Sequence, residues 1–382
     1  MAKLVFLGDY CNESNCQPRL GPRLQALFAE ADAILIDIEA PVDVPAGTPP
    51  VLKVGPNLQQ PLAAIATCRQ WGVTHCAMAN NHIMDFGRPG LESTLRALQD
   101  LTCIGAGLTV DQAYRPAYID TPQGRIGLLV FAEAQFGVLA PEDELATGGG
   151  FAWFDHPKAR ALIVATRKKC DVLIVQVHAG LEFVGIPLPE LRSRYREFVD
   201  LGADLIVGHH PHVFQGSECY QGKWIHYSLG NCFLDMMLDH PAASGAALAV
   251  EFDGQRLRSV LHPLQATAQS LEMASPESPL QPLYRERCAQ LSDERYLAMI
   301  TAACQEKWAD YYEDYYLQAL NALGAQPTLR SSQKFGKRLI KRALSNRQQR
   351  AQENQALLLH NIRIETHRWV VERVLANRVV PG

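Results

Sequence analysis

Short apolar runs alternate with longer amphipathic segments over the first half of the chain. The runs are rich in Val, Ile and Leu, which is typical of strands buried on both faces. The predicted strands are Leu4–Leu7, Ala33–Ile38, His75–Ala79, Gly127–Phe131, Val172–Val177 and Leu205–Val207. Helical periodicity appears between them, near 18–30, 57–71, 88–100, 155–169 and 189–201. This alternation predicts an α/β domain with a buried sheet.

The pattern changes between residues 212 and 264, where strand-like runs follow one another without long helical segments. These runs are Gly222–Tyr227, Ala246–Phe252 and Arg256–Leu264, and Asp253-Gly254 is typical of a tight hairpin turn. We therefore expect a second sheet that packs on the first.

Three prolines, Pro276, Pro279 and Pro282, lie in a stretch with Ser and Gln, which is typical of a linker. Beyond it the chain is polar and helical in pattern. The predicted organisation is a domain over 1–265, a linker over 266–282 and a helical extension over 283–382.

Composition is that of an ordinary globular protein with a sizeable core, since 47% of the 382 residues are hydrophobic and 20% are charged. The net charge is −4, but residues 331–382 carry 11 Lys/Arg against 3 Asp/Glu. Lys334–Arg350 has the pattern of a basic amphipathic helix, which favours either contact with a membrane or polyanion or docking on the acidic remainder. We prefer docking, and no nucleic-acid partner is expected.

The ten cysteines contain no CxxC pair, which argues against a zinc ribbon or a thioredoxin-type motif. The N-terminus resembles no signal peptide, and no apolar run approaches the roughly 18–20 residues that span a bilayer. A cytoplasmic location is expected.

Candidate metal ligands lie just beyond the carboxyl ends of the predicted strands. Asp9, Glu39, Asn81 and His178 each follow a different strand, and His210 and His212 follow a fifth. A single Asp or His at such a position is usually a turn former or a packed side chain. Because ligands bind beyond the carboxyl ends of parallel strands, five such clusters are expected to meet at one edge of the sheet.

Imidazole and carboxylate donors together suit Mn, Fe, Zn or Ni. Six ligands exceed the needs of one tetrahedral zinc ion, so we expect two divalent transition metal ions with a bridging carboxylate. His82 is the candidate general acid, and Asp85, three residues later, would orient its ring.

Six motifs in order resemble the CapA family, which is linked to synthesis of the bacterial poly-γ-glutamate capsule and is similar to calcineurin-like metallophosphoesterases. They are Gly8-Asp9, Asp37-Ile38-Glu39-Ala40-Pro41, Ala79–Gly87, His178–Glu182, Gly208–His212 and Tyr227–Asn231. The resemblance covers about residues 1–265 and implies a four-layer αββα sandwich with a dinuclear site. It places the six ligands on metal positions, Glu39 on that of a bridging Asp and His82 on that of the proton donor. It also favours Glu182 and Asn231 near the pocket.

The chain departs from the family pattern at four positions. Cys11 stands where the phosphoesterases have the His of Asp-x-His, so one metal position either lacks a ligand or uses a thiolate. Asp37 replaces the usual Asn, Cys232 replaces a Phe, and His209 is an additional histidine. Members of the family often carry a membrane anchor, and this chain shows none.

Three functions follow from these observations. The first is a phosphoesterase that uses metal-bound hydroxide with His82 as general acid. The second is an amide hydrolase that cleaves γ-glutamyl bonds at the same site. The third is a non-catalytic component of capsule or polymer biosynthesis with a structural metal site.

Overall fold

The computed structural model describes residues 1–139, 149–240, 244–314, 316, 356–357, 360 and 363–379. The chain divides into two compact units. One comprises Met1–Val51 and Asn57–Leu297, and the other comprises Leu52–Pro56 and Ala298–Gly382. The named strands all lie in the first unit.

The first sheet has nine strands, and β1 (Ala2–Cys11) lies at its centre. On one side of β1 three strands follow in parallel: β3 (Ala33–Ile38), β4 (His75–Ala77) and β5 (Thr102–Ile104). On the other side the order is β16 (Gly245–Phe252), β17 (Leu257–Ala266), β18 (Ser270–Met273) and β2 (Arg19–Leu20). The carboxyl end of β1 also pairs with β15 (Asn231–Leu234), which brings Asn231 beside Asp9.

The second sheet has six strands in the order β13 (Ser217–Tyr220), β14 (Lys223–His226), β12 (Leu205–His209), β11 (Val172–His178), β8 (Gly124–Ala132) and β7 (Ala117–Thr121). Its four central strands run parallel to one another. A small third sheet joins β6 (Ala106–Gly107), β10 (Gly150–Ala152) and β9 (Val138–Leu139).

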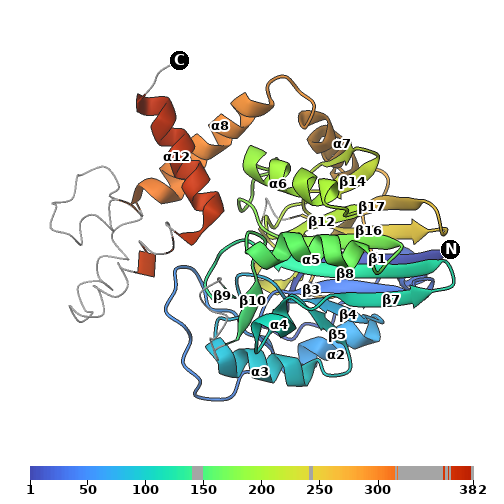
Figure 1. Cartoon of the computed structure of the whole chain (residues 1–382). Helices are drawn as coiled ribbons and strands as arrows, with labels where there is room; N and C mark the ends of the chain where they lie inside the picture. The colour runs from blue at the N-terminus through green and yellow to red at the C-terminus, as the bar shows by residue number, and fades with distance from the viewer. Residues whose placement is uncertain are drawn as a thin grey trace. The chain divides into compact units, whose positions relative to one another are not determined.

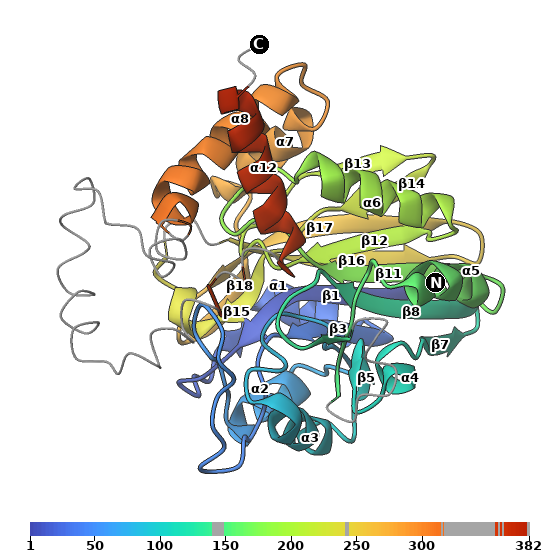
Figure 2. The same ribbon diagram turned by 60° about the vertical axis from the view of Figure 1, so that its left-hand side comes forward.

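Helices cover the outer faces of both large sheets (Figures 1 and 2). α2 (Leu62–Gln70) and α3 (Gly87–Ala97) lie on the first sheet, and α5 (Pro157–Arg167) and α6 (Pro189–Asp200) lie on the second. Other helices among the described residues of this unit are α1 (Pro22–Ala29), α4 (Val110–Ala113), the 3₁₀ turn η2 (Asp235–Met237) and α7 (Leu280–Gln290). The four-layer αββα sandwich that the resemblance implied is confirmed.

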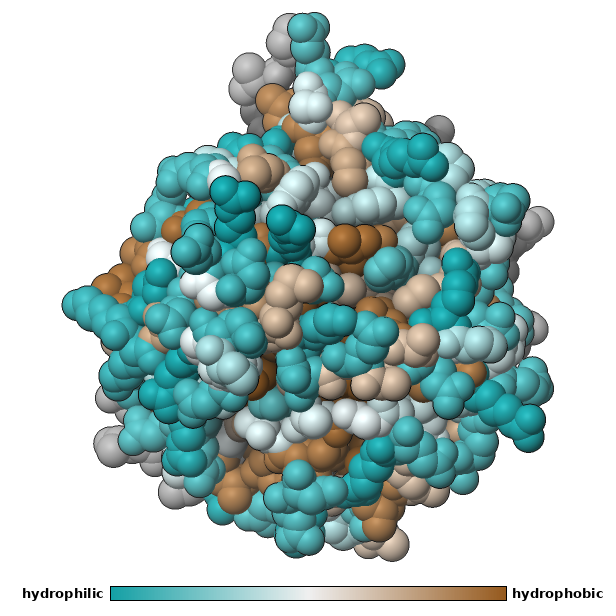
Figure 3. Space-filling view, turned by 90° about the vertical axis from the view of Figure 1, so that its right-hand side faces the viewer, coloured by the Kyte–Doolittle hydropathy of each residue, from teal (hydrophilic) through white to brown (hydrophobic). Residues whose placement is uncertain are grey.

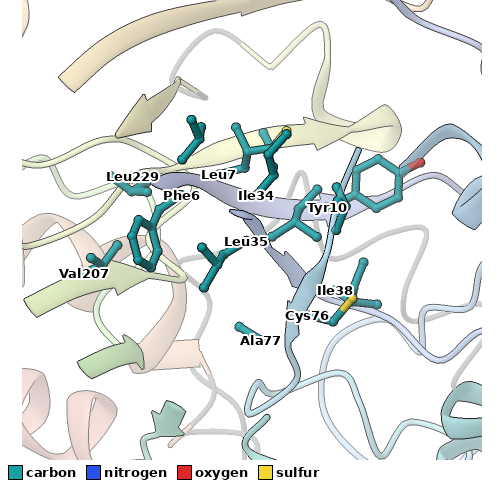
Figure 4. Close-up of a cluster of buried hydrophobic side chains, with 14 of the residues drawn as sticks. Phe6, Leu7, Tyr10, Ile34, Leu35, Ile38, Cys76, Ala77, Val207 and Leu229 are labelled. Carbon is teal, nitrogen blue, oxygen red and sulfur yellow. The ribbon is translucent and has the colours of Figure 1, made fainter. Parts of the chain in front are cut away.

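A large apolar cluster joins the inner faces of the two sheets. Phe6 and Leu35 come from the first sheet and Val207 from the second, and all three belong to one buried cluster (Figure 4). Burial on both faces explains why these strands lack an alternating pattern in the sequence. The face in Figure 3 lies on the side of the N-terminus and carries polar side chains interspersed with smaller apolar groups.

The six strands predicted from apolar runs are confirmed as β1, β3, β4, β8, β11 and β12, but they belong to two sheets rather than one. A second sheet packs on the first as expected, but residues 212–264 do not build it by themselves. There β14 joins the second sheet, whereas β16 and β17 extend the first. Hydrophobic periodicity identifies a strand but carries no information about which strand pairs with it.

Residues 266–282, expected as a linker, contain β18, which pairs with β17 and β2, and the start of α7. Pro279 occupies the N-cap of α7, and Pro282 lies in its first turn. Proline is tolerated there because the first amides of a helix have no intrahelical partner. Two of the three prolines that suggested a linker therefore mark the start of a helix in the first unit.

The second unit contains most of α8 (Tyr296–Lys307), followed by a π-helical turn, Trp308–Tyr312, and by α12 (Glu365–Val379). Tyr312 contacts His367 edge to face with ring centroids 5.0 Å apart, and His367 contacts His360 at 4.7 Å. Burial lowers the pKa of His360 to about 4 and lowers the pKa of His367 as well, so both rings are neutral at pH 7.

Glu218 on β13 ties the second sheet to helix α6. It pairs with Arg192 and with Arg196, whose Nε lies 2.8 Å from Oε1 of Glu218. Burial alone would raise the pKa of Glu218, but hydrogen bonds from the two arginines and from Tyr227 lower it to about 2. The side chain is 12% exposed, so these partners replace much of its hydration.

Glu218→Gln is expected to lower the free energy of unfolding at pH 7 by about 2 kcal/mol, the scale of a charged hydrogen-bond set. Because the folded-state pKa of Glu218 is depressed, its contribution is present above the unfolded value near 4.5 and is lost as the pH falls towards 2. Urea unfolding at pH 7 and at pH 3 measures the effect. An equal deficit at both values would contradict it.

Candidate metal centre

Side chains at the carboxyl ends of strands from both large sheets form one buried cluster. Asp9 lies near the end of β1, and Glu39 directly follows β3. His178 is the last residue of β11, and His210 and His212 follow β12. Each of these five residues is at most 3% exposed. The expected convergence therefore occurs, although two facing sheets supply it.

The first group of donors consists of Glu39, His178 and His210, joined by Asn81. Nε2 of His178 lies 2.8 Å from Oδ1 of Asn81, 3.1 Å from Nδ1 of His210 and 3.6 Å from Oε1 of Glu39. One ligand atom from each of Glu39, His178 and His210 lies within 4.8 Å of the others. The spacing fits one cation between them.

The second group consists of Asp9, Glu39 and His212. Nδ1 of His212 lies 3.6 Å from Oδ2 of Asp9, and Nε2 of His212 lies 3.9 Å from Oε1 of Glu39. Nδ1 also lies 3.0 Å from Oδ1 of Asn231, the residue that β15 brings beside β1. Glu39 thus belongs to both groups.

A third group, Asp9, Asp37 and His209, also has atoms within 4.8 Å. Both oxygens of Asp37 are engaged, however. Asn80 donates to Oδ1 at 2.9 Å, and Nδ1 of His178 lies 3.0 Å from Oδ2. Asp37 therefore acts as a buried support for His178 and leaves Nε2 of that ring directed at Asn81 and Glu39.

Neighbouring carboxylates also shift the pKa of His178. Burial lowers the pKa of this ring, but Asp37, Asp9 and Glu133 outweigh burial and raise it above its usual value. A carboxylate behind a metal-binding imidazole fixes its tautomer and strengthens its donor nitrogen. Asp37, where the family usually has Asn, is the residue that provides this contact.

Asp37→Asn is expected to weaken binding of zinc by about 10- to 100-fold, because an amide holds the Nδ1 proton of His178 less strongly than a carboxylate. Competition with a fluorescent zinc chelator measures the affinity. Asp120→Asn, at an exposed carboxylate on β7, is the matched control and should leave it unchanged. Equal affinities for wild type and Asp37→Asn would show that Asp37 does not support the ring.

Asp9 is surrounded by histidines. Burial raises the pKa of Asp9, but His209, His178 and His212 together lower it below its usual value. Its Oδ2 accepts a hydrogen bond from the backbone amide of His210 at 3.1 Å, whereas its buried Oδ1 accepts none from the described residues. A buried carboxylate oxygen of this kind suits a cation.

His210 and His212 adopt left-handed backbone conformations, with φ of 95° and 56°. Such angles are uncommon for residues other than Gly, and strain of this kind concentrates at functional sites. The turn brings both rings to the cluster, one into each group of donors. The intervening Pro211 is conformationally restricted, which helps to hold the turn.

His82 and Asp85 form a buried pair in the segment that follows β4. Nδ1 of His82 lies 2.7 Å from Oδ2 of Asp85, and this oxygen also accepts the backbone amide of Leu58 at 2.6 Å. Asn80 receives the backbone amides of His82 and Ile83 at 3.2 and 2.9 Å. The predicted contact between His82 and Asp85 is present, and Asn80 braces the turn that carries both.

Cys11 belongs to none of the three donor groups found among the described residues. It packs with Ala40, Leu58 and Leu234 in a small apolar cluster. Burial and the nearby charges of Glu13 and Glu39 raise the pKa of the thiol well above its usual value. Of the two expectations for Cys11, the missing ligand therefore fits better than the thiolate.

Several residues of the cluster were not identified from the sequence. Glu133 directly follows β8, at the same phase as the predicted ligands, and its Oε1 lies 3.9 Å from Nε2 of His210. Its position after a buried strand is the sequence feature that could have identified Glu133. His209 bonds Gln176 through Nε2 at 3.2 Å and lies 3.5 Å from Asp9 through Nδ1, a contact that no sequence pattern indicates.

Of the two residues that the resemblance favoured near the pocket, Asn231 contacts His212, whereas Glu182 is exposed. A close approach of two chain segments explains the position of Asn231. A Cβ on Gly8 would lie 1.8 Å from the carbonyl oxygen of Gly230, so only glycine lets these segments meet beside Asp9.

The predicted basic helix, Lys334–Arg350, lies outside the described residues. Within the part of the chain that the structure describes, no helix is both long and apolar enough to cross a membrane.

Comparison with known proteins identifies the family of this chain. The model of the family described as "Bacterial capsule synthesis protein PGA_cap" matches residues 10–236. The "PGA biosynthesis protein CapA" of Bacillus subtilis (strain 168) is 33% identical over 182 residues, which cover 47% of each chain. A "Probable polyglutamine synthesis accessory protein" of Mycobacterium tuberculosis (strain ATCC 25618 / H37Rv) is 30% identical over 167 residues, 41% of this chain and 44% of that one. The chain thus spans about half the length of the curated relatives it matches.

A solved structure of a hypothetical protein from Thermus thermophilus covers 68% of this chain and 99% of its own, with 11% identity and a TM-score of 0.41. A similarity this low supports no conclusion about the site. The family match extends from the end of β1 into η2 and includes both donor groups except Asp9, which lies one residue before its start. On this match, the chain belongs to the PGA_cap family of bacterial capsule synthesis proteins.

Proposed function

We propose that this chain is a dinuclear metal-dependent hydrolase that acts on a phosphoester. The observation that carries the proposal is the position of Glu39, whose Oε1 lies 3.6 Å from Nε2 of His178 and 3.9 Å from Nε2 of His212. One carboxylate between two groups of donors is the arrangement expected of a bridging ligand.

Six residues are assigned as ligands. Glu39, Asn81, His178 and His210 would hold one cation, and Asp9, Glu39 and His212 would hold the other. The imidazole, carboxylate and amide donors suit Mn, Fe, Zn or Ni. Two such ions, when bound, would supply an activated water molecule and neutralise charge that develops on the phosphoryl oxygens.

The remaining chemistry belongs to the side chains of the chain itself. Asp85 holds Nδ1 of His82 at 2.7 Å, which orients the ring as a proton donor for the oxygen that leaves. Asp37 holds His178 in one tautomer. The leaving group departs as an alcohol because His82 supplies the proton.

A cavity of about 490 Å³ adjoins Asn231 and is the candidate for the rest of the substrate. Oδ1 of Asn231 contacts His212, while its Nδ2 lies 3.9 Å from Sδ of Met237, which lines the cavity. Asn231 therefore stands between the second donor group and a space large enough for a small organic group.

Metal analysis combined with an assay of aryl phosphate hydrolysis tests the proposal. Purified protein is expected to contain close to two divalent ions per chain, and chelation should abolish hydrolysis until metal is restored. A chain that binds no metal on addition would exclude every function that depends on this site.

A second candidate is hydrolysis of a γ-glutamyl amide at the same site. The names of the relatives, which refer to PGA biosynthesis and polyglutamine synthesis, favour it. An assay of γ-linked glutamyl peptides beside aryl phosphates separates the two, because each predicts turnover of its own substrate class.

The word "accessory" in the name of the mycobacterial relative favours a third candidate, a non-catalytic role in polymer synthesis with a structural metal site. Bound metal without turnover of either substrate class would support it. The basic segment Lys334–Arg350 would then be the candidate contact with a polyanion or a membrane.

A further inference from the structure

A cavity of about 270 Å³ lies in the first unit, between the start of α1, strands β17 and β18 and the start of α7. Its polar side chains are Arg23, His262, Gln281 and Arg285. Its described lining contains no acidic side chain and none of the residues assigned to the metal centre. The cavity is therefore a separate feature with a basic character.

Arg23 is held in place before any ligand arrives. Its Nη2 donates to the carbonyl oxygens of Met273 at 2.7 Å and of Ala274 at 2.8 Å, both at the end of β18. Carbonyl oxygens orient a guanidinium group without neutralising its positive charge. The guanidinium of Arg23 can therefore still attract an anion and bind it through its other N–H groups.

Neither Arg23 nor Arg285 forms an ion pair with a carboxylate of the described residues, although the chain pairs many of its other arginines. Arg285 and Gln281 are four residues apart on α7, so their side chains emerge on the same face of that helix. Two guanidinium groups and an amide thus converge on one small space.

The pKa of the neighbouring His262 ring indicates that the electrostatic potential in the cavity is positive. Burial lowers the pKa of His262, and the charge of Arg23 lowers it further. His262 pairs with Ala247 across β16 and β17, which fixes its backbone beside the cavity. Excess positive charge without a matching acid is the condition under which a protein binds an anion.

We propose that this cavity binds an oxyanion, either a phosphate or a carboxylate group, through Arg23 and Arg285. Planar guanidinium groups bind both kinds of oxyanion through paired N–H donors, and the amide of Gln281 adds a further donor. The ligand would be one anionic group of a larger molecule, either a phosphorylated compound or an anionic polymer. The site does not depend on the proposed hydrolase activity.

NMR titration of the His262 ring tests the proposal, because this ring lines the cavity and no residue assigned to the metal centre does. The full chain is titrated in the presence of a chelator with inorganic phosphate and, separately, with a γ-linked triglutamate. The His262 resonance is identified among the 12 histidines by its loss in His262→Asn. Binding of either probe at about millimolar concentration should raise the pKa of His262, because the bound anion offsets the charge of Arg23.

Substitution of single arginines then distinguishes specific binding in the cavity from non-specific electrostatic attraction of anions to the protein. Arg285→Gln and Arg23→Gln should each weaken binding of the effective probe by about tenfold or more, the equivalent of about 1.4 kcal/mol. Arg115→Gln, at an exposed arginine elsewhere on the first unit, is the matched control and should leave binding unchanged. Arg285 is exposed on α7, so its substitution is not expected to impair folding.

A response to phosphate alone would identify the ligand group as a phosphate, and a stronger response to triglutamate would identify it as a carboxylate of a polymer. The proposal is overturned if neither probe moves the His262 titration at 50-fold higher concentrations. It is overturned equally if Arg285→Gln and Arg115→Gln respond alike.

Discussion

Glu39→Gln is expected to reduce the metal content from about two ions per chain to one or fewer and to lower kcat for aryl phosphates by at least about a thousandfold. Glu39 belongs to both donor groups, so its replacement weakens both positions at once. Gln keeps the size of the side chain but removes the charge that would hold two cations close together. Metal analysis after gel filtration and initial-rate kinetics measure the two effects.

The matched control for this substitution is Glu294→Gln, at an exposed carboxylate in the first unit, which should retain full metal content and rate. Circular dichroism checks that Glu39→Gln still folds. Retention of two ions by a folded Glu39→Gln protein would show that the carboxylate does not bridge, and the assignment of a dinuclear centre would have to be abandoned.

His82→Ala is expected to lower kcat by about 10²- to 10⁴-fold while metal content stays near that of the wild type. His82 is bound to Asp85 through Nδ1 and belongs to none of the donor groups, so its loss should remove the proton donor without removing a ligand. The effect should be largest for substrates with poor leaving groups, such as alkyl phosphates. It should shrink for p-nitrophenyl phosphate, whose leaving group needs little protonation.

Asp85→Asn is the companion variant, because Asp85 acts through the ring of His82. It should reduce kcat by about 10- to 100-fold with the same dependence on the leaving group. Loss of metal from His82→Ala, or an equal rate loss for alkyl and aryl substrates, would refute the role of general acid.

Local chemistry in the sequence was enough to find most of the cluster. Asp9, Glu39, His178 and the two histidines after β12 each lie at or just beyond the carboxyl end of an apolar run. Ligands bind at this end of the strands in a parallel sheet. The same local rule identified the strands themselves. It required no knowledge of the partner strands, because each strand is recognised by its own hydrophobic residues.

Residues whose role depends on a distant partner could not be found in this way. Asp37 supports His178 across 141 positions of sequence, and Asp9 meets the backbone of His210 across 201. Asn231 reaches His212 because β15 pairs with β1, a pairing that also requires Gly8 beside Gly230. Such contacts arise from the arrangement of the sheets, and no periodic pattern in the sequence indicates them.

By itself, the sequence determined the α/β class, the positions of the central strands and the six candidate ligands, because these depend on local hydrophobicity and on residue type. Only the tertiary structure decided that the ligands come from two facing sheets and that Glu39 lies between two donor groups. It also placed Cys11 in an apolar cluster rather than among the donors. The physical reason is that strand pairing and sheet packing are set by contacts between residues far apart in the chain, whereas each strand carries only its own pattern.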